Sequence, residues 1–395
     1  MLDTPNDLPR SLWLTRPRPP AEADAVVVGG GVTGLSIAWW LGRLAPAGYR
    51  VTLVEAGHLA GRASGRNAGF LLTGTAQPFV SAAAAHGRAA ALALWHRSRE
   101  NRELVRAELL DPGLVDADFL PEGSWHAALA GGDQEERLAA SCEELRGEGI
   151  DCEWRDAAAV REASGGGDRL GGALFLPRDG GLDPLALCRG LAASGGFEVR
   201  TGCRVHALEA DDGRLRVVAD GGDLAAPCVV VATNAYAAEL LPGFAEEVAP
   251  RRAQMLATAP GERLLTGVWY MNDGYAYARQ LADGTLLLGG ARDVAVDEEV
   301  GTLEAPTARV QGALEDFLAS AFPRLAGRPI VRRWAGIMAF TPDGLPRIGD
   351  VPGLPGAVAA VGWNGHGMSL AFAAGRHLAR RLLGEQVGEF LPRPG

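Results

Sequence analysis

The first feature of the chain that could do chemistry is a set of spaced glycines, Gly29, Gly31 and Gly34. In the pattern G-x-G-x-x-G, the first glycine allows a tight turn and the second lets the backbone approach a pyrophosphate. The third lets a helix pack closely on a strand. Glu55 follows Gly34 by 21 residues, a spacing at which an acidic side chain accepts hydrogen bonds from a ribose. These residues predict a dinucleotide site, although the glycine pattern alone does not choose between FAD and NAD.

A second glycine-rich loop, residues 61–70, begins soon after Glu55. Within it Arg62 and Arg66 could donate hydrogen bonds to phosphates or to ring carbonyls. Ser64 and Asn67 carry further hydrogen-bonding groups. A second small, polar loop so close to the acidic residue favours a long cofactor that lies deep in the fold. An ordinary turn is the alternative interpretation of this segment.

The sequence also offers a group that could hold an acidic substrate. Tyr275, Tyr277 and Arg279 alternate along a predicted strand, so their side chains share one face. A guanidinium binds a carboxylate through two parallel hydrogen bonds, which makes Arg279 the first candidate for that role. Arg252 and Arg292 are the other candidates, and a solvated strand face is the alternative interpretation.

The elements that must position these residues follow an α/β pattern. A strand at 24–29, a helix at 35–44 and a strand at 49–55 form a βαβ unit around the glycines. Period-two alternation with glycine turns predicts strands between 250 and 300. The predicted fold class is α/β: a doubly wound, Rossmann-like nucleotide-binding domain with a second domain of mixed β-sheet and helices.

Composition narrows the possible classes of protein. The 395 residues carry 38 basic and 48 acidic side chains, a net charge of −10, which argues against a nucleic-acid partner. All the basic residues are arginine, so mechanisms that need a lysine amine are excluded. No apolar run reaches the roughly 18 residues of a membrane span. The five cysteines form no CxxC pair, which argues against a metal site and fits a reducing, cytoplasmic location.

Several motifs, taken in order along the chain, resemble the D-amino-acid-oxidase-type flavoproteins. This group contains glycine oxidase, sarcosine oxidase and γ-glutamylputrescine oxidase. Besides the segments 29–55 and 63–69, the motifs are those at 232–236, 283–290 and 362–368. The resemblance implies FAD, bound by the Rossmann-like domain, with the mixed sheet lying over the flavin ring.

The resemblance also implies roles for particular positions. Val205 matches a strand whose backbone meets the adenine, and Gly365 begins a turn and helix start beside the flavin. N–H groups and a helix dipole at that place can stabilise negative charge on a reduced flavin. The residues expected to contact or position the cofactor are Gly29, Gly31, Val32, Thr33, Gly34, Glu55, Ala56, Arg62, Ser64, Gly65, Arg66, Asn67, Gly69, Val205, Ala232, Asn234, Gly336, Gly362, Asn364, Gly365, His366, Gly367, Met368 and Ser369. The residues expected to act on the substrate are Arg279, Tyr275, Tyr277 and His366, and a structural turn residue is the alternative for His366.

Two departures from these flavoproteins shape the expected chemistry. Gly336 stands where monomeric sarcosine oxidases carry the cysteine that is linked to their flavin, so non-covalent FAD is expected. Ser369 stands where they carry a lysine that helps to activate oxygen. The electron acceptor is therefore left open between oxygen and another acceptor.

The resulting hypothesis is an FAD-dependent amine or amino-acid oxidase or dehydrogenase. It would oxidise a C–N bond by hydride transfer to flavin N5 and give an imine that hydrolyses. One alternative is a flavin-dependent monooxygenase, for which Ile348-Gly349-Asp350 is a weak signal. The other alternative is a non-catalytic FAD-binding subunit of a larger complex.

The expected domains are discontinuous in sequence. Residues 20–85, 156–242 and 330–395 are assigned to the FAD-binding domain. Residues 86–155 and 243–329 are assigned to the substrate domain, and residues 1–19 to an N-terminal arm.

Overall fold

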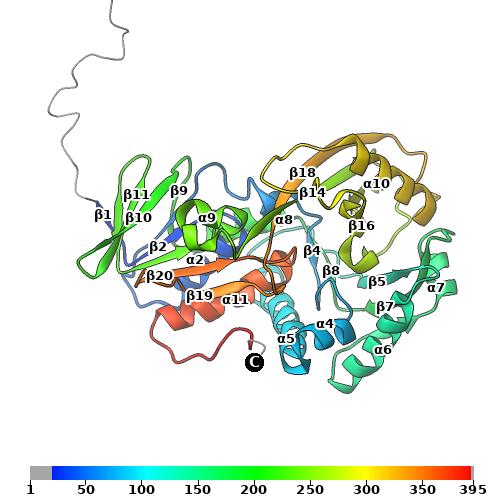
Figure 1. Cartoon of the computed structure of the whole chain (residues 1–395), viewed down its shortest axis with the longest axis horizontal. Coiled ribbons are helices and arrows are strands. Elements are labelled where there is room, and N and C mark those ends of the chain that lie inside the picture. The colour runs from blue at the N-terminus through cyan, green and yellow to red at the C-terminus, as the bar shows by residue number, and fades with distance from the viewer. Residues whose placement is uncertain (1–19, 393–395) are drawn as a thin grey trace, which may run out of the picture.

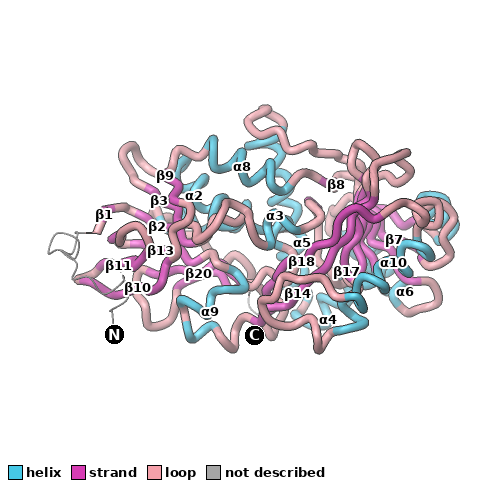
Figure 2. The backbone as a smooth tube through the Cα atoms, turned by 90° about the horizontal axis from the view of Figure 1, so that it is seen from above, coloured by secondary structure: helices cyan, strands magenta, loops and turns pink. Residues whose placement is uncertain are grey.

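The computed structural model describes residues 20–392, so the expected arm at 1–19 lies outside the described residues. Within them the strands form a six-stranded and an eight-stranded sheet, with a four-stranded and a two-stranded sheet beside them. Figures 1 and 2 show the six- and four-stranded sheets toward one end of the molecule and the eight-stranded sheet toward the other.

The six-stranded sheet carries the predicted βαβ unit. Its strands are parallel except for the edge strand β19, and apolar side chains bury β2, β3, β13 and β20 on both faces. In spatial order the strands are β19 (Arg347–Asp350), β20 (Ala357–Val361), β13 (Cys228–Val231), β2 (Ala25–Val28), β3 (Val51–Val54) and β9 (Glu198–Arg200).

Two helices of this layer approach each other closely at one glycine. They are α2 (Val32–Leu44) and α11 (Gly367–Leu382), with α8 (Pro184–Ser194) and α5 (Arg88–Val105) beside them. A Cβ on Gly375 would lie 2.9 Å from the backbone carbon of Ser36. The indole of Trp40 donates to the carbonyl of Phe372 at 3.0 Å. The close approach fixes where α11 begins, and that start faces the site described below.

The eight-stranded sheet forms the other wall. Helices α10 (Ala308–Ala321), α6 (Gln134–Gly147) and α7 (Ala157–Ala163) pack on it. In spatial order its strands are β18 (Ile330–Phe340), β14 (Ala249–Thr258), β17 (Leu286–Gly290), β16 (Ala276–Gln280), β15 (Val268–Met271), β5 (Ser124–Leu129), β7 (Leu170–Leu176) and β6 (Glu153–Arg155).

The smaller elements complete the two ends. The four-stranded sheet is β1 (Ala21–Glu22), β12 (Leu224–Ala226), β11 (Arg214–Ala219) and β10 (Val205–Asp211). The two-stranded sheet is β4 (Phe70–Leu71) and β8 (Gly180–Gly181), and the short helices include α3 (Ala63–Arg66), α4 (Phe79–His86) and α9 (Ala237–Leu240).

The α/β architecture with a second mixed sheet confirms the predicted fold class. Two strands nevertheless lie elsewhere than the sequence division placed them: β7 and β18, assigned to the FAD-binding domain, pair within the eight-stranded sheet. The reason is pairing at long range, since β18 lies antiparallel to β14 over almost its whole length. Local sequence patterns predict a strand but not the sheet that it joins. The domain boundaries themselves stay a prediction.

A buried ion pair centred on Asp179, between β7 and β8, connects the segment after β4 with α5 and β5. Asp179 is fully buried, and its carboxylate accepts from the guanidinium of Arg102 at 2.7 Å. It also accepts from the backbone N–H and hydroxyl of Thr73 at 2.9 and 2.8 Å, and from the hydroxyl of Ser124 at 2.8 Å. Removing this carboxylate would leave a buried guanidinium without its counter-charge.

We therefore expect Asp179→Ala to lower the free energy of unfolding by about 3–5 kcal/mol, because it breaks a buried pair from one side. Urea denaturation followed by tryptophan fluorescence measures this change. Asp151→Ala is the matched control, since the Asp151–Arg178 pair is exposed and should contribute less than about 1 kcal/mol. Equal losses in the two variants would contradict the role given to Asp179.

Candidate functional site

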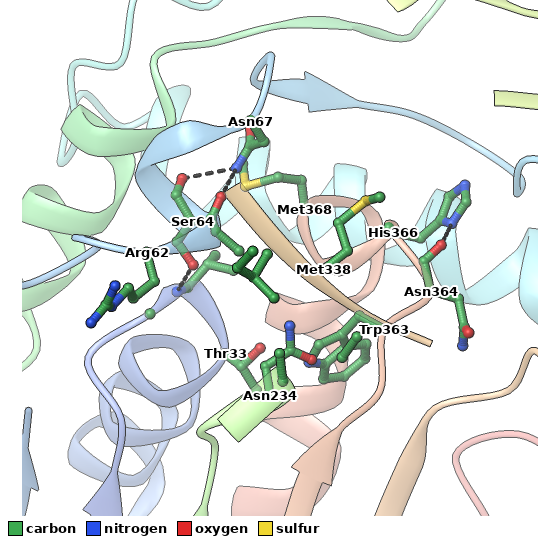
Figure 3. A pocket seen from close by; sticks show the side chains of 18 of the residues that line it. Thr33, Arg62, Ser64, Asn67, Asn234, Met338, Trp363, Asn364, His366 and Met368 are labelled. Atoms are coloured by element: carbon green, nitrogen blue, oxygen red, sulfur yellow. Dashed lines mark hydrogen bonds between the residues drawn. The ribbon is translucent and has the colours of Figure 1, made fainter. Parts of the chain in front are cut away.

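A cavity of about 680 Å³ lies between the two large sheets. It extends from the turn after β2, past the loop at 62–68, to the start of α11 and the faces of β15, β16 and β18. Figure 3 shows side chains from these separate segments meeting around it, including Thr33, Ser64, Met338 and His366. The cavity therefore joins the predicted nucleotide-binding turn to the predicted substrate wall.

The glycine turn at one end has no room for side chains. A Cβ on Gly29 would lie 2.7 Å from the carbonyl oxygen of Ala232, and φ of Gly29 is +113°, a value that favours glycine. A Cβ on Gly34 would lie 1.9 Å from the carbonyl oxygen of Gly29. This is the close strand–helix packing that the third glycine of the pattern predicts. The N-terminus of α2 consequently faces the cavity with its first-turn N–H groups, which have no partner inside a helix.

Glu55 is held in place by two backbone N–H groups. Gly30 donates to one carboxylate oxygen and Gly57 to the other, both at 2.7 Å. The side chain lines the cavity together with Ala56 and Val205. Two carboxylate oxygens have capacity beyond these bonds, so Glu55 can still accept from a ribose hydroxyl.

The second glycine-rich loop forms the short helix α3 and only part of it faces the cavity. Ser64 lines the cavity and accepts from the backbone N–H of Val32 at 2.9 Å. Asn67 also lines it, but its amide donates to the carbonyls of Ala63 and Ser64 and accepts from Gly69, so it holds the loop together (Figure 3).

The two arginines of this loop have different environments. Arg62 lines the cavity and lies over the ring of Tyr236 at 5.4 Å. Arg66 lies outside the lining and donates to the carbonyls of Gly61 and Ala335 at 3.0 and 2.9 Å. Both guanidinium groups pair with Glu304, at 2.7 Å for Arg62 and 3.2 Å for Arg66. The backbone and Glu304 accept from the guanidinium of Arg66 in this structure, and the expected contact between Arg66 and the cofactor stays a prediction.

Two asparagines shape the turn at the start of α11. Asn234 accepts from the backbone N–H of Gly362 at 3.1 Å, which links the ends of β13 and β20. Asn364 accepts from the N–H of Thr341 at 2.9 Å and donates to the carbonyl of Gly362 at 2.7 Å. Both residues have left-handed φ values, +48° and +50°. Their side chains fix the backbone that lines the cavity.

The wall opposite the turn carries neutral polar groups. Nδ1 of His366 lies 2.9 Å from the carbonyl oxygen of Asn364, so it carries the proton and donates (Figure 3). The phenol of Tyr270 lies 3.4 Å from Nε2 of the same ring and donates to it. Burial lowers the pKa of His366 and raises the pKa of Tyr270, and burial raises the pKa of Tyr277 to about 12. All three side chains are therefore uncharged near neutral pH.

A second histidine lies behind this wall. The ring of His126, on β5, meets the ring of Tyr270 edge-on at 5.6 Å. Burial lowers the pKa of His126 from 6.5 to about 4, and its Nε2 has no hydrogen-bond partner among residues 20–392. The neutral form of this imidazole is the one that fits the folded protein.

The three candidate arginines for an acidic substrate are separated by the structure. Arg279 is buried outside the cavity lining, where it donates to the carbonyl of Leu182 at 2.9 Å and packs against Gly181. Arg252 is buried and paired with Glu299 at 2.6 Å. Arg292 lines the cavity and lies over the rings of Tyr275 and Phe340 at 5.2 and 5.0 Å. Of the three, Arg292 lines the cavity with Tyr275 and Tyr277, whereas Arg279 lies behind the lining and its Nε and Nη1 have no hydrogen-bond partner among residues 20–392. The role given to Arg279 stays a prediction.

The other predicted residues divide into two groups. Some glycines lie behind the cavity surface, because their neighbours leave no room for a Cβ or, at Gly336, only limited room; these are Gly34, Gly65, Gly69, Gly336 and Gly362. The remaining predicted residues line the cavity: Gly29, Gly31, Val32, Thr33, Glu55, Ala56, Arg62, Ser64, Asn67, Val205, Ala232, Asn234, Tyr275, Tyr277, Asn364, Gly365, His366, Gly367, Met368 and Ser369. Their contacts with a cofactor stay predictions.

Sequence reasoning missed several polar residues of the lining, among them Tyr270, Asp273 and Arg137. Tyr270 stands in β15, where alternation with Val268 signals its inward face. Asp273 follows it and pairs with Arg137 of α6 at 3.4 Å, and both line the cavity. No local pattern marks Arg137, since it lies on a polar helix whose partner is far away in sequence.

The lining fits FAD on the evidence of this chain alone. The turn at 29–34 offers bare backbone and helix N–H groups to a pyrophosphate, and Glu55 offers acceptors to a ribose. At the far end, the start of α11 directs a second set of N–H groups toward the cavity, where a ring with developing negative charge would be stabilised.

Metal sites and membrane-spanning helices are both absent from residues 20–392. No cluster of three or more histidine, cysteine, aspartate or glutamate side chains there could hold a metal ion. No helix within the same range is both long enough and apolar enough to cross a membrane.

The sequence is similar to a protein family and to several characterised proteins. Residues 24–381 match the family model described as FAD dependent oxidoreductase. The chain is 30% identical over 390 residues to gamma-glutamylputrescine oxidoreductase of Escherichia coli (strain K12), covering 92% of this chain and 84% of that protein. It is also 30% identical over 369 residues to a glycine oxidase of Pseudomonas aeruginosa, covering 91% of this chain and 95% of that protein.

Solved structures show the same fold at lower identity. The crystal structure of glycine oxidase from Geobacillus kaustophilus has a TM-score of 0.77 at 24% identity, covering 93% of this chain and 96% of that one. L-proline dehydrogenase from P. horikoshii has a TM-score of 0.77 at 22% identity, covering 91% and 93%. The resemblance inferred from the sequence motifs is confirmed.

The glycine turn gives a test of cofactor binding. A Cβ on Gly31 would lie 2.9 Å from the hydroxyl oxygen of Ser64, so Gly31→Val should push side-chain atoms into the cavity. We expect the Kd for FAD, measured by titration of the apoprotein, to rise more than about tenfold, which corresponds to about 1.4 kcal/mol. Gly147→Val, at the end of α6 with no atom within 4 Å of the added Cβ, is the control. An unchanged Kd for the Gly31 variant would contradict this placement of the cofactor.

The buried His126 gives a pH dependence. Its folded-state pKa lies below the unfolded value, so the unfolded chain binds the proton more readily and the wild type loses stability as pH falls from 6.5 toward 4. His126→Phe lacks this loss. The free energy of unfolding of His126→Phe minus that of wild type should therefore rise by about 2–3 kcal/mol when the pH is lowered from 7 to 4.5.

Urea denaturation of both proteins at the two pH values measures this gain. His58→Phe serves as the control, because His58 is exposed. A difference between wild type and the His126 variant that stays constant with pH would show that His126 is not held neutral.

Proposed function

The chain belongs to the family of FAD-dependent oxidoreductases, and on that basis we propose that it oxidises the C–N bond of an amine or amino acid. The observation that carries the proposal is the single cavity that joins the nucleotide-binding turn at Gly29 to the neutral wall of Tyr270, Tyr277 and His366. FAD, when bound, supplies the acceptor for the hydride that leaves the carbon next to nitrogen.

The protein's own part in this reaction is to bind and orient an uncharged amine. The phenol of Tyr270 donates a hydrogen bond to His366, so the lone pairs of the phenol oxygen stay free to accept a hydrogen bond from an N–H of the substrate. A neutral wall does not stabilise an ammonium, so it favours the amine form whose nitrogen lone pair can assist loss of hydride. Aromatic and apolar side chains around the wall, including Phe70, Leu72 and Phe340, exclude water from the same place.

Arg292 supports amino acids as substrates. Its guanidinium lines the cavity and forms no ion pair or hydrogen bond with any of the residues 20–392. A carboxylate that enters the cavity can therefore take both donors of the fork. The glycine oxidase relative has a substrate of this kind in its name, and the gamma-glutamylputrescine oxidoreductase relative names an amine that also bears a carboxylate.

The two alternative functions have less support. The Gly349-Asp350 pair that suggested a monooxygenase lies on the edge strand β19, where Asp350 pairs with Arg381 outside the cavity lining. A non-catalytic subunit would have no need for the buried polar wall, and the relatives are named for oxidation reactions.

We also propose a cytoplasmic location and either oxygen or another electron acceptor. All five cysteines are free, which fits a reducing compartment. Ser369 lines the cavity beside His366. Its hydroxyl is neutral and supplies no positive charge for the reduction of oxygen, so the electron acceptor is left open.

Anaerobic titration tests the proposed function. The FAD-loaded protein is mixed with a panel of amines and amino acids, and separately with a reduced nicotinamide cofactor, while the flavin absorbance is followed. Bleaching by at least one amine or amino acid is the expected result. Bleaching only by the nicotinamide cofactor would favour the monooxygenase alternative, and no bleaching by either would favour the non-catalytic one.

We expect the FAD to be bound non-covalently. Gly336 faces the side chain of Arg66, with the built Cβ 3.2 Å from it, and offers no group for a covalent link. Cys203 lines the cavity only near Glu55, and its thiol donates to the carbonyl of Asp220 at 3.0 Å. Acid precipitation should therefore release all the FAD into the supernatant; flavin retained on the washed polypeptide would contradict this expectation.

The assignment of Arg292 is tested by comparing two substrates. Arg292→Gln should raise the KM for an amino acid about tenfold to a hundredfold, because a charged hydrogen bond contributes about 1.5–3 kcal/mol. The KM for an amine without a carboxylate should change little. Arg279→Gln is the matched control, and a selective loss of amino-acid binding in that variant would return the role to Arg279.

A further inference from the structure

Two buried cysteines lie in contact with each other outside the main cavity. Cys142 belongs to α6, Cys152 directly precedes β6, and their sulfur atoms are 3.7 Å apart. They are 2% and 5% exposed. Neither sulfur lines the cavity described above, so the proposed oxidation of amines makes no use of them.

We propose that this pair is a site of reversible oxidation, at which hydrogen peroxide converts the two thiols to a disulfide between Cys142 and Cys152. The bond would join the C-terminal half of α6 to the edge strand β6 of the eight-stranded sheet.

The local backbone allows the sulfurs to meet. A disulfide bond is about 2.05 Å long, so the two atoms must approach by roughly 1.7 Å. The connecting segment is a turn after the end of α6, in which Gly149 has φ of +74° and the N–H of Ile150 bonds to the carbonyl of Leu145 at 2.9 Å. Cys152 follows this turn outside regular structure, so a small rotation of its side chain and turn can close the gap.

The contact between the sulfurs sets the order of the steps. Either sulfur can donate to the other, and the thiol of Cys152 also donates to the carbonyl oxygen of Cys142 at 3.6 Å. The hydrogen bond between the sulfurs lowers the pKa of Cys142, while the same bond and burial raise the pKa of Cys152. Because the thiol proton of Cys152 has this carbonyl as an acceptor, Cys142 is the sulfur that reacts first as the thiolate.

The chemistry balances with one equivalent of peroxide. The Cys142 thiolate attacks one peroxide oxygen, the O–O bond breaks, and sulfenic acid and hydroxide form; the hydroxide takes up the thiol proton as water. The sulfur of Cys152 then attacks the sulfenic sulfur, its proton goes to the departing oxygen, and a second water leaves. Two thiols and one hydrogen peroxide give one disulfide and two waters.

The surroundings select for a small oxidant. A separate cavity of about 170 Å³ is lined by Ile150 and Asp151, which directly precede Cys152 in the chain, although neither sulfur lines it. Peroxide is close to water in size and can enter such a space. A bulky disulfide such as oxidised glutathione cannot reach sulfurs that are this deeply buried.

The test uses the FAD-loaded, fully reduced protein without substrate. It is treated with hydrogen peroxide, or in parallel with oxidised glutathione, then denatured in excess N-ethylmaleimide and mapped by mass spectrometry. We expect peroxide to give a cross-linked peptide joining Cys142 and Cys152, about two mass units lighter than the two thiols, while Cys188 is alkylated. Oxidised glutathione should leave both thiols alkylated.

Two variants sharpen the result. In Cys152→Ser, dimedone added together with the denaturant after peroxide treatment should trap a sulfenic acid on Cys142, because the second sulfur is missing. In Cys188→Ser, which removes a buried cysteine of α8, the cross-link should form as in wild type. Alkylation of both Cys142 and Cys152 after a treatment that fully oxidises free glutathione in the same tube would overturn the proposal. A disulfide to any other cysteine would overturn it as well.

Discussion

The site depends on how closely three backbone segments approach one another where β2, β13 and β20 end. The turn at Gly29 passes within contact of the carbonyl of Ala232, so that a single added carbon would clash at 2.7 Å. Asn234 then bonds across to Gly362. In this sheet the chain leaves β2 toward β3 on one side and returns to β13 and β20 on the other. A crevice forms at such a reversal of strand order, and this crevice is the nucleotide end of the cavity.

The eight-stranded sheet lies across the cavity from that crevice and supplies a surface of uncharged polar side chains. Its strands bring Tyr270 and Tyr277 to the cavity as neutral phenols, and the start of α11 adds a neutral imidazole at His366. Charges are kept to the edges: Arg62 pairs with Glu304, Arg137 pairs with Asp273, and Arg292 stands over aromatic rings. Among residues 20–392 the result is an uncharged region for the reacting carbon–nitrogen bond, with Arg292 as an available cation nearby.

The nucleotide half of the site could be predicted from the sequence because its requirements are local. Spaced glycines, a buried strand and a terminal acidic residue lie within one βαβ unit, and Gly29, Gly31 and Glu55 all line the cavity as expected. The rest of the site depends on interactions between distant segments. Arg66 and Arg279 stand in plausible positions by spacing, but each donates to a distant carbonyl, that of Ala335 or Leu182, which no local pattern reveals. Arg137 was missed for the same reason, whereas Tyr270 has a local signal in its alternation with Val268.

In the proposed reaction a hydride passes to the flavin from the carbon next to an amine nitrogen. The most direct test is the rate of anaerobic flavin reduction with an amine substrate and with the same substrate carrying deuterium on that carbon. Slower reduction with the deuterated substrate, a primary isotope effect clearly above unity, is predicted because the C–H bond breaks as the flavin is reduced. Identical rates for the two substrates, measured with the protein saturated by substrate, would contradict hydride transfer from that carbon.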